Sequence, residues 1–256
     1  MIRVKLGAQL FTVRDFAKDT ESLEKTLETI AKIGYTAVQL SGVCAYDPKW
    51  MKETLKRLGL TAPITHYDFK KITESPEETS AFHKTFGAEY VGIGCSPFPF
   101  DREGFDKLTT PLLAVADYYQ SQHQKLTYHN HNMEFSRLDG ELFLDKLTSA
   151  FSKDQLGITL DTYWVQAGGG DSAEWLKALS GRVDCIHLKD MAFAMPEREQ
   201  RMAPIGRGNM NFERILSAAE DAGTRYAFVE QDNCYGEDPF DCLKESYDYL
   251  KALGLS

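Results

Sequence analysis

The sequence predicts one α/β domain with a (β/α)8 TIM barrel fold, and three observations support this prediction. The chain has 256 residues, close to the roughly 250 that such a barrel typically requires. Short apolar runs alternate with amphipathic segments from end to end, a pattern typical of βαβ units and a parallel sheet. The strand-like runs number eight, as a closed barrel needs. We therefore treat residues 1–256 as a single domain.

The eight predicted strands are short runs rich in apolar residues. In order they are KLGAQLFTV (5–13), TAVQLSG (36–42), TAPITHY (61–67), YVGIGC (90–95), KLTYHNH (125–131), LGITLDT (156–162), DCIHLKD (184–190) and AFVEQD (227–232).

Amphipathic segments between these runs predict the helices. In the first, Leu23, Leu27 and Ile30 recur at spacings of three and four and so share one face. The eight predicted helices are Thr20 to Ile33, Lys49 to Leu58, Pro76 to Phe86, Arg102 to Gln122, Gly140 to Phe151, Asp171 to Leu179, Asn211 to Ala222 and Pro239 to Leu253. Glycines that typically end helices follow four of them: Gly34, Gly59, Gly87 and Gly223.

The longest irregular stretch runs from Met191 to Asn209, after the seventh strand. Connections longer than about 12 to 15 residues often form lids or binding loops. We therefore expect this segment to cover the active site.

Composition and charge exclude several classes of function. The net charge is −9 and no basic cluster exceeds a Lys-Lys pair, whereas nucleic-acid binders usually carry a basic patch. No stretch approaches the roughly 18 to 20 apolar residues of a membrane span. The five cysteines are widely spaced without a CxxC pair, so neither a disulfide framework nor a zinc-thiolate site is indicated. These features, with a start that lacks a signal-peptide pattern, predict a soluble, cytoplasmic protein that does not act on DNA or RNA.

Polar side chains cluster at the carboxyl ends of the predicted strands, where barrel enzymes carry their catalytic groups. They are Gln9, Gln39, His66, His129, His131, Glu134, Asp161, His187, Lys189 and Glu230. Four of these, on the fifth to eighth strands, predict one metal site: Glu134, Asp161, His187 and Glu230. A set of carboxylates and imidazole without thiolate favours Mn²⁺ or Mg²⁺, with Co²⁺ and Zn²⁺ as alternatives.

The chain resembles the xylose isomerase-like TIM barrel family of sugar isomerases and epimerases over nearly its whole length. The resemblance is carried by YHNHNMEF (128–135), LDTYWVQAGG (160–169), IHLKD (186–190), PIGRGNMNF (204–212) and VEQD (229–232).

The resemblance implies roles for individual residues. Asp161, His187 and Glu230 match metal ligands, and Glu230 also matches the catalytic acid or base. Ketose 3-epimerases of the family carry a glutamate at the end of the fifth strand, where spacing places His129 here. We choose Glu134, the only carboxylate of that motif, as first ligand and second catalytic carboxylate, and keep His129 as the alternative ligand.

The implied reaction is a divalent-metal-dependent isomerisation or epimerisation of a keto sugar or sugar phosphate through an enediolate, with Mn²⁺ as the first choice of metal. His129 and His131 are then candidates for proton transfer or substrate binding. His66, Lys189, Trp164 and Gln9 are candidates for substrate contacts. Lys189 could instead pair with Asp190.

Three other functions remain open at this point. A lyase or dehydratase acting on a keto sugar, keto cyclitol or 3-keto-glycoside would use the same enediolate. A sugar-binding barrel without activity would not need metal ligands and a base together. An apurinic endonuclease needs further histidines, but Trp164 stands three residues after Asp161. Homo-oligomers are also expected among such barrels, and Phe98, Phe100, Tyr118 and Tyr119 could serve an interface or the core.

Overall fold

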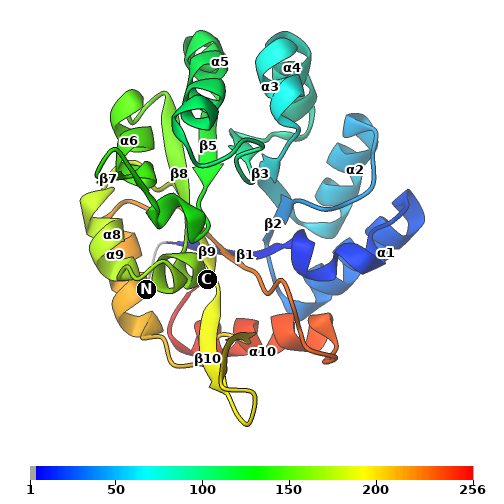
Figure 1. The fold of residues 1–256 in the computed structure, drawn as a ribbon. Helices are drawn as coiled ribbons and strands as arrows, with labels where there is room; N and C mark the ends of the chain where they lie inside the picture. The colour runs from blue at the N-terminus through cyan, green and yellow to red at the C-terminus, as the bar shows by residue number, and fades with distance from the viewer. Residues whose placement is uncertain (1–3, 256) are drawn as a thin grey trace.

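The computed structural model describes residues 4–255, and its centre is a closed barrel of eight parallel strands (Figure 1). Neighbouring strands follow the order β1-β12-β9-β8-β5-β4-β3-β2. Their bounds are β1 Lys5–Gln9, β2 Ala37–Leu40, β3 Thr61–His66, β4 Tyr90–Ile93, β5 Lys125–His129, β8 Leu156–Asp161, β9 Cys185–Leu188 and β12 Tyr226–Val229. The predicted barrel and all eight of its strands are therefore confirmed.

Helices form a ring outside the barrel in Figure 1. Their bounds are α1 Thr20–Ile33, α2 Pro48–Leu58, α3 Phe69–Glu74, α4 Pro76–Phe86, α5 Arg102–Ser121, α6 Phe143–Ala150, α7 Thr162–Ala167, α8 Ser172–Ala178, α9 Phe212–Asp221 and α10 Pro239–Ala252. In α1, both ends agree with the prediction, and the capping contacts explain why. Asp19 accepts a hydrogen bond from the Ser22 amide at its start, and Gly34 ends it with a φ of 120°.

Several elements differ from the prediction. The first strand stops at Gln9, and Leu10–Phe16 forms a 3-10 helix in which Gln9 caps the amide of Phe11. Helices α3 and α7 were not predicted, because each has only six residues and shows too little periodicity.

The stretch from Met191 to Asn209 is partly regular. β10, Asp190–Ala194, pairs with β11, Glu199–Ala203, as an antiparallel hairpin that projects from the barrel (Figure 1). Its tip is exposed, with Phe193 and Met195 left 57% and 65% accessible. A further two-stranded sheet, β6 Arg137–Leu138 with β7 Glu141–Leu142, and a 3-10 turn η2, Met133–Phe135, lie after β5.

Alternation along the strands divides the barrel interior into an apolar floor and a polar mouth. In β12, Tyr226 and Phe228 belong to an interior apolar cluster while Ala227 and Val229 pack in the outer core. The interior cluster is completed by residues of other strands: Ala37, Ile64, Tyr90 and Cys185. Because side chains two residues apart share a face of a strand, Glu230 follows Phe228 on the interior side. The same alternation places His187 above Cys185.

The four aromatic residues considered for an interface or the core all contact the core. Tyr119 is fully buried, and its hydroxyl donates to the carbonyl of Ile72 at 3.0 Å. Phe98, Phe100 and Tyr118 are partly buried against the same core. All five cysteines are free. Within residues 4–255, none of the helices has the length and apolar character needed to cross a bilayer.

His83, in α4, makes stability depend on pH. It is fully buried, with Nδ1 2.7 Å from the Thr79 carbonyl and Nε2 2.8 Å from the Thr65 hydroxyl. Burial lowers the pKa of His83 from 6.5 to about 4. In the unfolded chain His83 binds a proton near pH 6.5, whereas in the folded protein it does so only near pH 4. The stability linked to the neutral imidazole is therefore present above pH 6.5 and is lost as the pH falls toward 4.

We therefore expect His83→Gln to remove part of the acid sensitivity. Between pH 7 and pH 5, urea unfolding should show wild type losing about 2 kcal/mol more stability than the variant. The exposed His123 supplies the control, since His123→Gln deletes a histidine without a buried site. Equal losses in wild type and His83→Gln would contradict the prediction.

Candidate active site

Four polar side chains meet at the mouth of the barrel, each from the end of a different strand. His129 ends β5, Asp161 ends β8, His187 lies in β9 and Glu230 follows β12. One ligand atom from each lies within 4.8 Å of those of the other three. The four strands are neighbours in the barrel, and all four side chains are buried. Residues up to 101 positions apart in the chain, His129 and Glu230, thus converge at one point.

The orientation of His129 leaves a lone pair facing a carboxylate. Nδ1 lies 2.9 Å from the Gly94 carbonyl, which can only accept, so Nδ1 carries the proton. Burial and the neighbouring His187 lower the pKa of His129, so the ring is neutral and Nε2 has no proton. Nε2 lies 3.1 Å from Oδ2 of Asp161. Two hydrogen-bond acceptors at this distance repel each other unless a cation lies between or beside them.

His187 is held in the same way. Nε2 lies 2.6 Å from the Gln39 side-chain oxygen, which fixes the proton on Nε2. Nδ1 then faces Oε2 of Glu230 at 2.9 Å, yet Nδ1 has no hydrogen-bond partner among residues 4–255. Carbonyl oxygens that orient the far nitrogen of an imidazole are typical of histidine metal ligands. The donor set of two imidazoles and two carboxylates therefore fits a divalent ion such as Mn²⁺.

Lys189 balances the carboxylates of this cluster. Its ammonium lies 3.1 Å from Asp161 Oδ2 and 3.0 Å from Glu230 Oε2. Burial alone would raise the pKa of Asp161 and of Glu230, but Lys189 and the imidazoles hold both pKa values well below the usual range. For His187 burial opposes protonation, and Glu230 and Asp161 outweigh it and raise the pKa. Both carboxylates are therefore charged at neutral pH.

Glu134, chosen above as first ligand, does not join this cluster. Its carboxylate accepts from the Tyr128 hydroxyl at 2.6 Å and from the His131 amide at 2.8 Å. Tyr128 packs in the outer core, on the face of β5 opposite His129. The η2 turn therefore directs Glu134 toward the helix layer, and His129, the alternative ligand, lies in the cluster instead.

A cavity of about 460 Å³ opens above the cluster, and several predicted substrate contacts line it. Gln9 donates to Glu230 Oε1 at 2.8 Å. His66 bonds Ser41 through Nδ1 at 3.1 Å and leaves Nε2 without a partner among residues 4–255. His131 also lines the cavity, and within that range its Nδ1 has no partner. Burial and His129 lower its pKa to about 3.

Trp164 stands beside these groups rather than in the cavity lining. Its ring centroid lies 5.4 Å from that of His131 and 5.6 Å from the Lys189 ammonium. The indole Nε1 is buried, and no hydrogen-bond partner for it occurs in the described part of the chain.

The sequence interpretation overlooked Asp232 and assigned no role to Gln39. Asp232 lines the cavity and contacts Lys189 through both carboxylate oxygens. The signal for Asp232 in the sequence is its position two residues after Glu230, because residues two apart in an extended segment lie on the same face. Gln39 had been noted only as a polar residue at a strand end.

Asp190 does not pair with Lys189, the alternative considered above. Its carboxylate accepts backbone amides of Met191, Gly206, Gly208 and Met210 at 2.8 to 3.2 Å. A Cβ on Gly208 would lie 2.3 Å from Asp190 Oδ1. The two glycines of the IGRGN segment therefore allow the backbone to wrap around this carboxylate, which anchors the loop after the hairpin.

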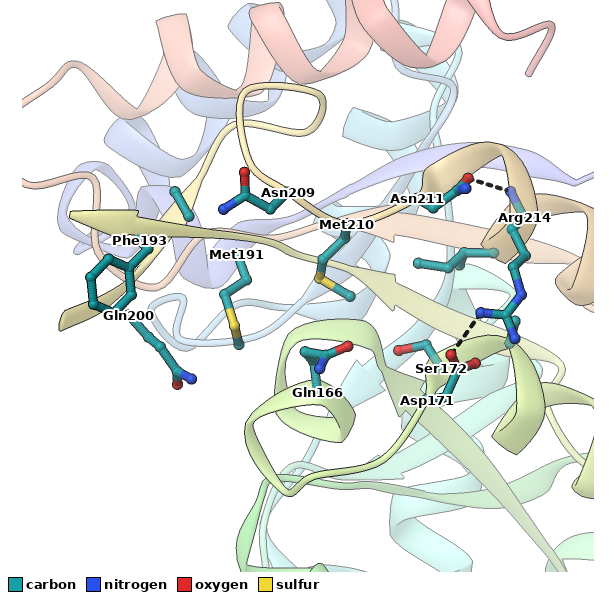
Figure 2. A pocket seen from close by; sticks show the side chains of 13 residues that line it. Gln166, Asp171, Ser172, Met191, Phe193, Gln200, Asn209, Met210, Asn211 and Arg214 are labelled. Atoms are coloured by element: carbon teal, nitrogen blue, oxygen red, sulfur yellow. Dashed lines mark hydrogen bonds and ion pairs between the residues drawn. The ribbon is translucent and has the colours of Figure 1, made fainter. Parts of the chain in front are cut away.

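The hairpin lines a neighbouring cavity of about 400 Å³ instead of the cavity above the cluster (Figure 2). Figure 2 shows Met191 and Met210 pointing toward Gln166, beside the ion pair of Arg214 with Asp171. The hairpin contributes no residue to the lining of the 460 Å³ cavity, so the expected lid over the active site is not seen in residues 4–255.

The family of the chain follows from a direct comparison. Residues 27–253 match the family model described as xylose isomerase-like TIM barrel. The chain belongs to this family. Its assignment agrees with the barrel and with the strand-end cluster, and the predicted resemblance is confirmed. No curated protein matched the chain.

Solved structures resemble this xylose isomerase-like barrel over almost its full length. A sugar phosphate isomerase/epimerase from Parabacteroides distasonis has 20% identity and a TM-score of 0.82, with 98% of this chain and 95% of that chain covered. An L-ribulose 3-epimerase has 15% identity and a TM-score of 0.75, covering 98% and 94%. A probable 3-DHS dehydratase from Bacillus anthracis has 14% identity and a TM-score of 0.74, covering 97% and 99%. At these identities the similarity establishes the fold alone.

Proposed function

We propose that this chain is a divalent-metal-dependent isomerase or epimerase of keto sugars. The observation that carries the proposal is the group of four donor atoms from His129, Asp161, His187 and Glu230, within 4.8 Å of one another below a cavity. These residues would hold the ion, with Mn²⁺ the first choice and Mg²⁺, Co²⁺ or Zn²⁺ as alternatives. When bound, the ion would polarise the substrate carbonyl and stabilise the enediolate.

The protein's own residues would carry the proton. Glu230 is charged and takes a fixed orientation from Gln9 at 2.8 Å, which suits the removal of a carbon-bound proton. His131 and His66 line the same cavity, each with a ring nitrogen that has no partner among residues 4–255, so they are the candidates for returning a proton on the other face. Trp164, whose indole Nε1 has no partner among residues 4–255, would donate to a substrate oxygen.

We infer that the substrate is not phosphorylated. The cavity lining contains three carboxylates, Asp68, Glu230 and Asp232, and its one lysine or arginine side chain is Lys189. The described contacts of its ammonium are with carboxylates and the face of Trp164. A phosphate dianion usually needs arginine, lysine or several free amides, so a neutral sugar suits this cavity better.

One observation favours a lyase as the second candidate. An epimerase of the two-carboxylate type needs a second acid on the opposite face, but Glu134 is turned toward Tyr128. In an elimination from a keto sugar, a keto cyclitol or a 3-keto-glycoside, Glu230 would take the carbon-bound proton while the leaving oxygen takes a proton from His131 or His66, so no second carboxylate is needed. The solved structures of the same fold include a probable dehydratase.

The test is deuterium uptake in D₂O by the Mn²⁺-loaded protein, followed by NMR and mass spectrometry. A panel of unphosphorylated keto sugars and their phosphate esters is compared, with Glu230→Gln as the variant. We expect uptake from an unphosphorylated sugar, reduced about a hundredfold or more in the variant. A product of unchanged formula indicates isomerisation or epimerisation, and loss of water or an aglycone indicates the lyase. Failure of the wild type to bind any divalent ion would overturn the proposal.

A further inference from the structure

Lys189 occupies the same carboxylate oxygens that the proposed metal centre needs. Its ammonium lies 3.1 Å from Asp161 Oδ2 and 3.0 Å from Glu230 Oε2. These are the oxygens that face the imidazoles, since Asp161 Oδ2 lies 3.1 Å from His129 Nε2 and Glu230 Oε2 lies 2.9 Å from His187 Nδ1. An ammonium and a divalent ion on the same two oxygens repel each other. They therefore compete for the cluster.

Asp232 offers the ammonium a second anchor outside the cluster. Its two carboxylate oxygens lie 3.0 and 2.9 Å from Lys189 Nζ, while Asp232 is absent from the group of four possible ligands. Its backbone is held at both sides, because its carbonyl accepts from Arg14 at 3.1 Å and its amide lies 3.3 Å from the Met202 sulfur. The carboxylate is thus held beside Lys189 without being one of the four possible ligands.

We propose that Asp232 is a positioning residue that holds the Lys189 ammonium away from Asp161 and Glu230 when a divalent ion binds, so that ammonium and metal exchange on these two carboxylates. The inference rests on the proposed metal centre. Lys189 thus opposes metal binding unless Asp232 retains the Lys189 ammonium. In the loaded site the ammonium would remain on Asp232, at the edge of the cavity.

The test is the Mn²⁺ dissociation constant from isothermal titration calorimetry, with folding checked by circular dichroism. Lys189→Met removes the competing cation, and we expect binding about tenfold tighter than wild type. Asp232→Asn removes the second anchor, and we expect binding about tenfold weaker. Lys189→Gln removes the same charge and replaces Lys189→Met if that variant does not fold.

The double variant separates positioning from a plain charge effect. If Asp232 acts through Lys189, Asp232→Asn should change the dissociation constant of Lys189→Met by less than about twofold. An equal weakening in both backgrounds would overturn the inference, as would a Lys189→Met protein that binds no tighter than wild type. The pair Lys125 and Asp184, 2.7 Å apart at the other end of the barrel, provides the matched charge control through Lys125→Met and Asp184→Asn.

The outcomes also distinguish this inference from the proposed function. Mn²⁺ binding by wild type with unaffected variants would leave the metal centre standing and overturn the role of Asp232. Absence of Mn²⁺ binding in wild type and in every variant would overturn both.

Discussion

Replacing His129 by glutamine is expected to abolish tight divalent-ion binding, whereas the same replacement at Glu134 is expected to leave it intact. His129 presents Nε2 to Asp161 at 3.1 Å, and Gly94 fixes the ring through Nδ1. A glutamine amide is a far weaker ligand than an imidazole. We expect the Mn²⁺ dissociation constant to rise by at least about a hundredfold, the upper end of the effect of removing a supporting contact.

Glu134→Gln is the matched control, because it changes a buried side chain three residues after His131 without touching the cluster. In Glu134 the two contacts use different oxygens, and glutamine can keep both if its oxygen accepts from the His131 amide while its NH2 group donates to the Tyr128 hydroxyl. Elemental analysis of both purified variants and of wild type, after supply of Mn²⁺, makes the comparison. Loss of metal with Glu134→Gln and retention with His129→Gln would reverse the assignment and restore Glu134 as ligand.

Phe228→Ala is expected to lower the free energy of unfolding by about 3–5 kcal/mol, because it empties the apolar floor of the barrel. Phe228 is fully buried and stacks on Tyr226, with ring centroids 6.1 Å apart. Its ring also lies against β1, where a Cβ on Gly7 would come within 2.6 Å of it. Little around this ring can move to fill the space.

Urea unfolding of wild type and variant measures the effect. Phe193→Ala is the control, since Phe193 lies on the hairpin with 57% of its surface exposed, and we expect a change of no more than about 0.5 kcal/mol. Similar losses at the two positions would contradict the assignment of Phe228 to the structural core. Phe228→Leu should lie between them, because most of the volume is retained.

Much of the fold could be predicted from the sequence, since its signals are local. In α1, the spacing of Leu23, Leu27 and Ile30 and the Asp19 cap define a helix without reference to the rest of the chain. The hairpin of β10 and β11 escaped prediction because its strands carry mixed side chains, EQRMA in one of them, with no clean alternation.

The candidate site could be predicted in part. Asp161, His187 and Glu230 each follow an apolar strand run directly, so their convergence follows from the geometry of a parallel barrel. The sequence could not decide between Glu134 and His129 for the fourth position, because the two are only five residues apart and the sequence contains no signal for the η2 turn that directs Glu134 outward.

The sequence by itself determined the barrel, its eight strands and the family, because these depend on periodicity, strand-end residues and motifs spread over the chain. The tertiary structure decided that His129 faces Asp161, that Glu134 binds Tyr128, and that Lys189 shares its ammonium among three carboxylates. These contacts join side chains from different strands. Their partners are set by which face of a strand each residue occupies and by the turns between strands, and only the closed barrel specifies both.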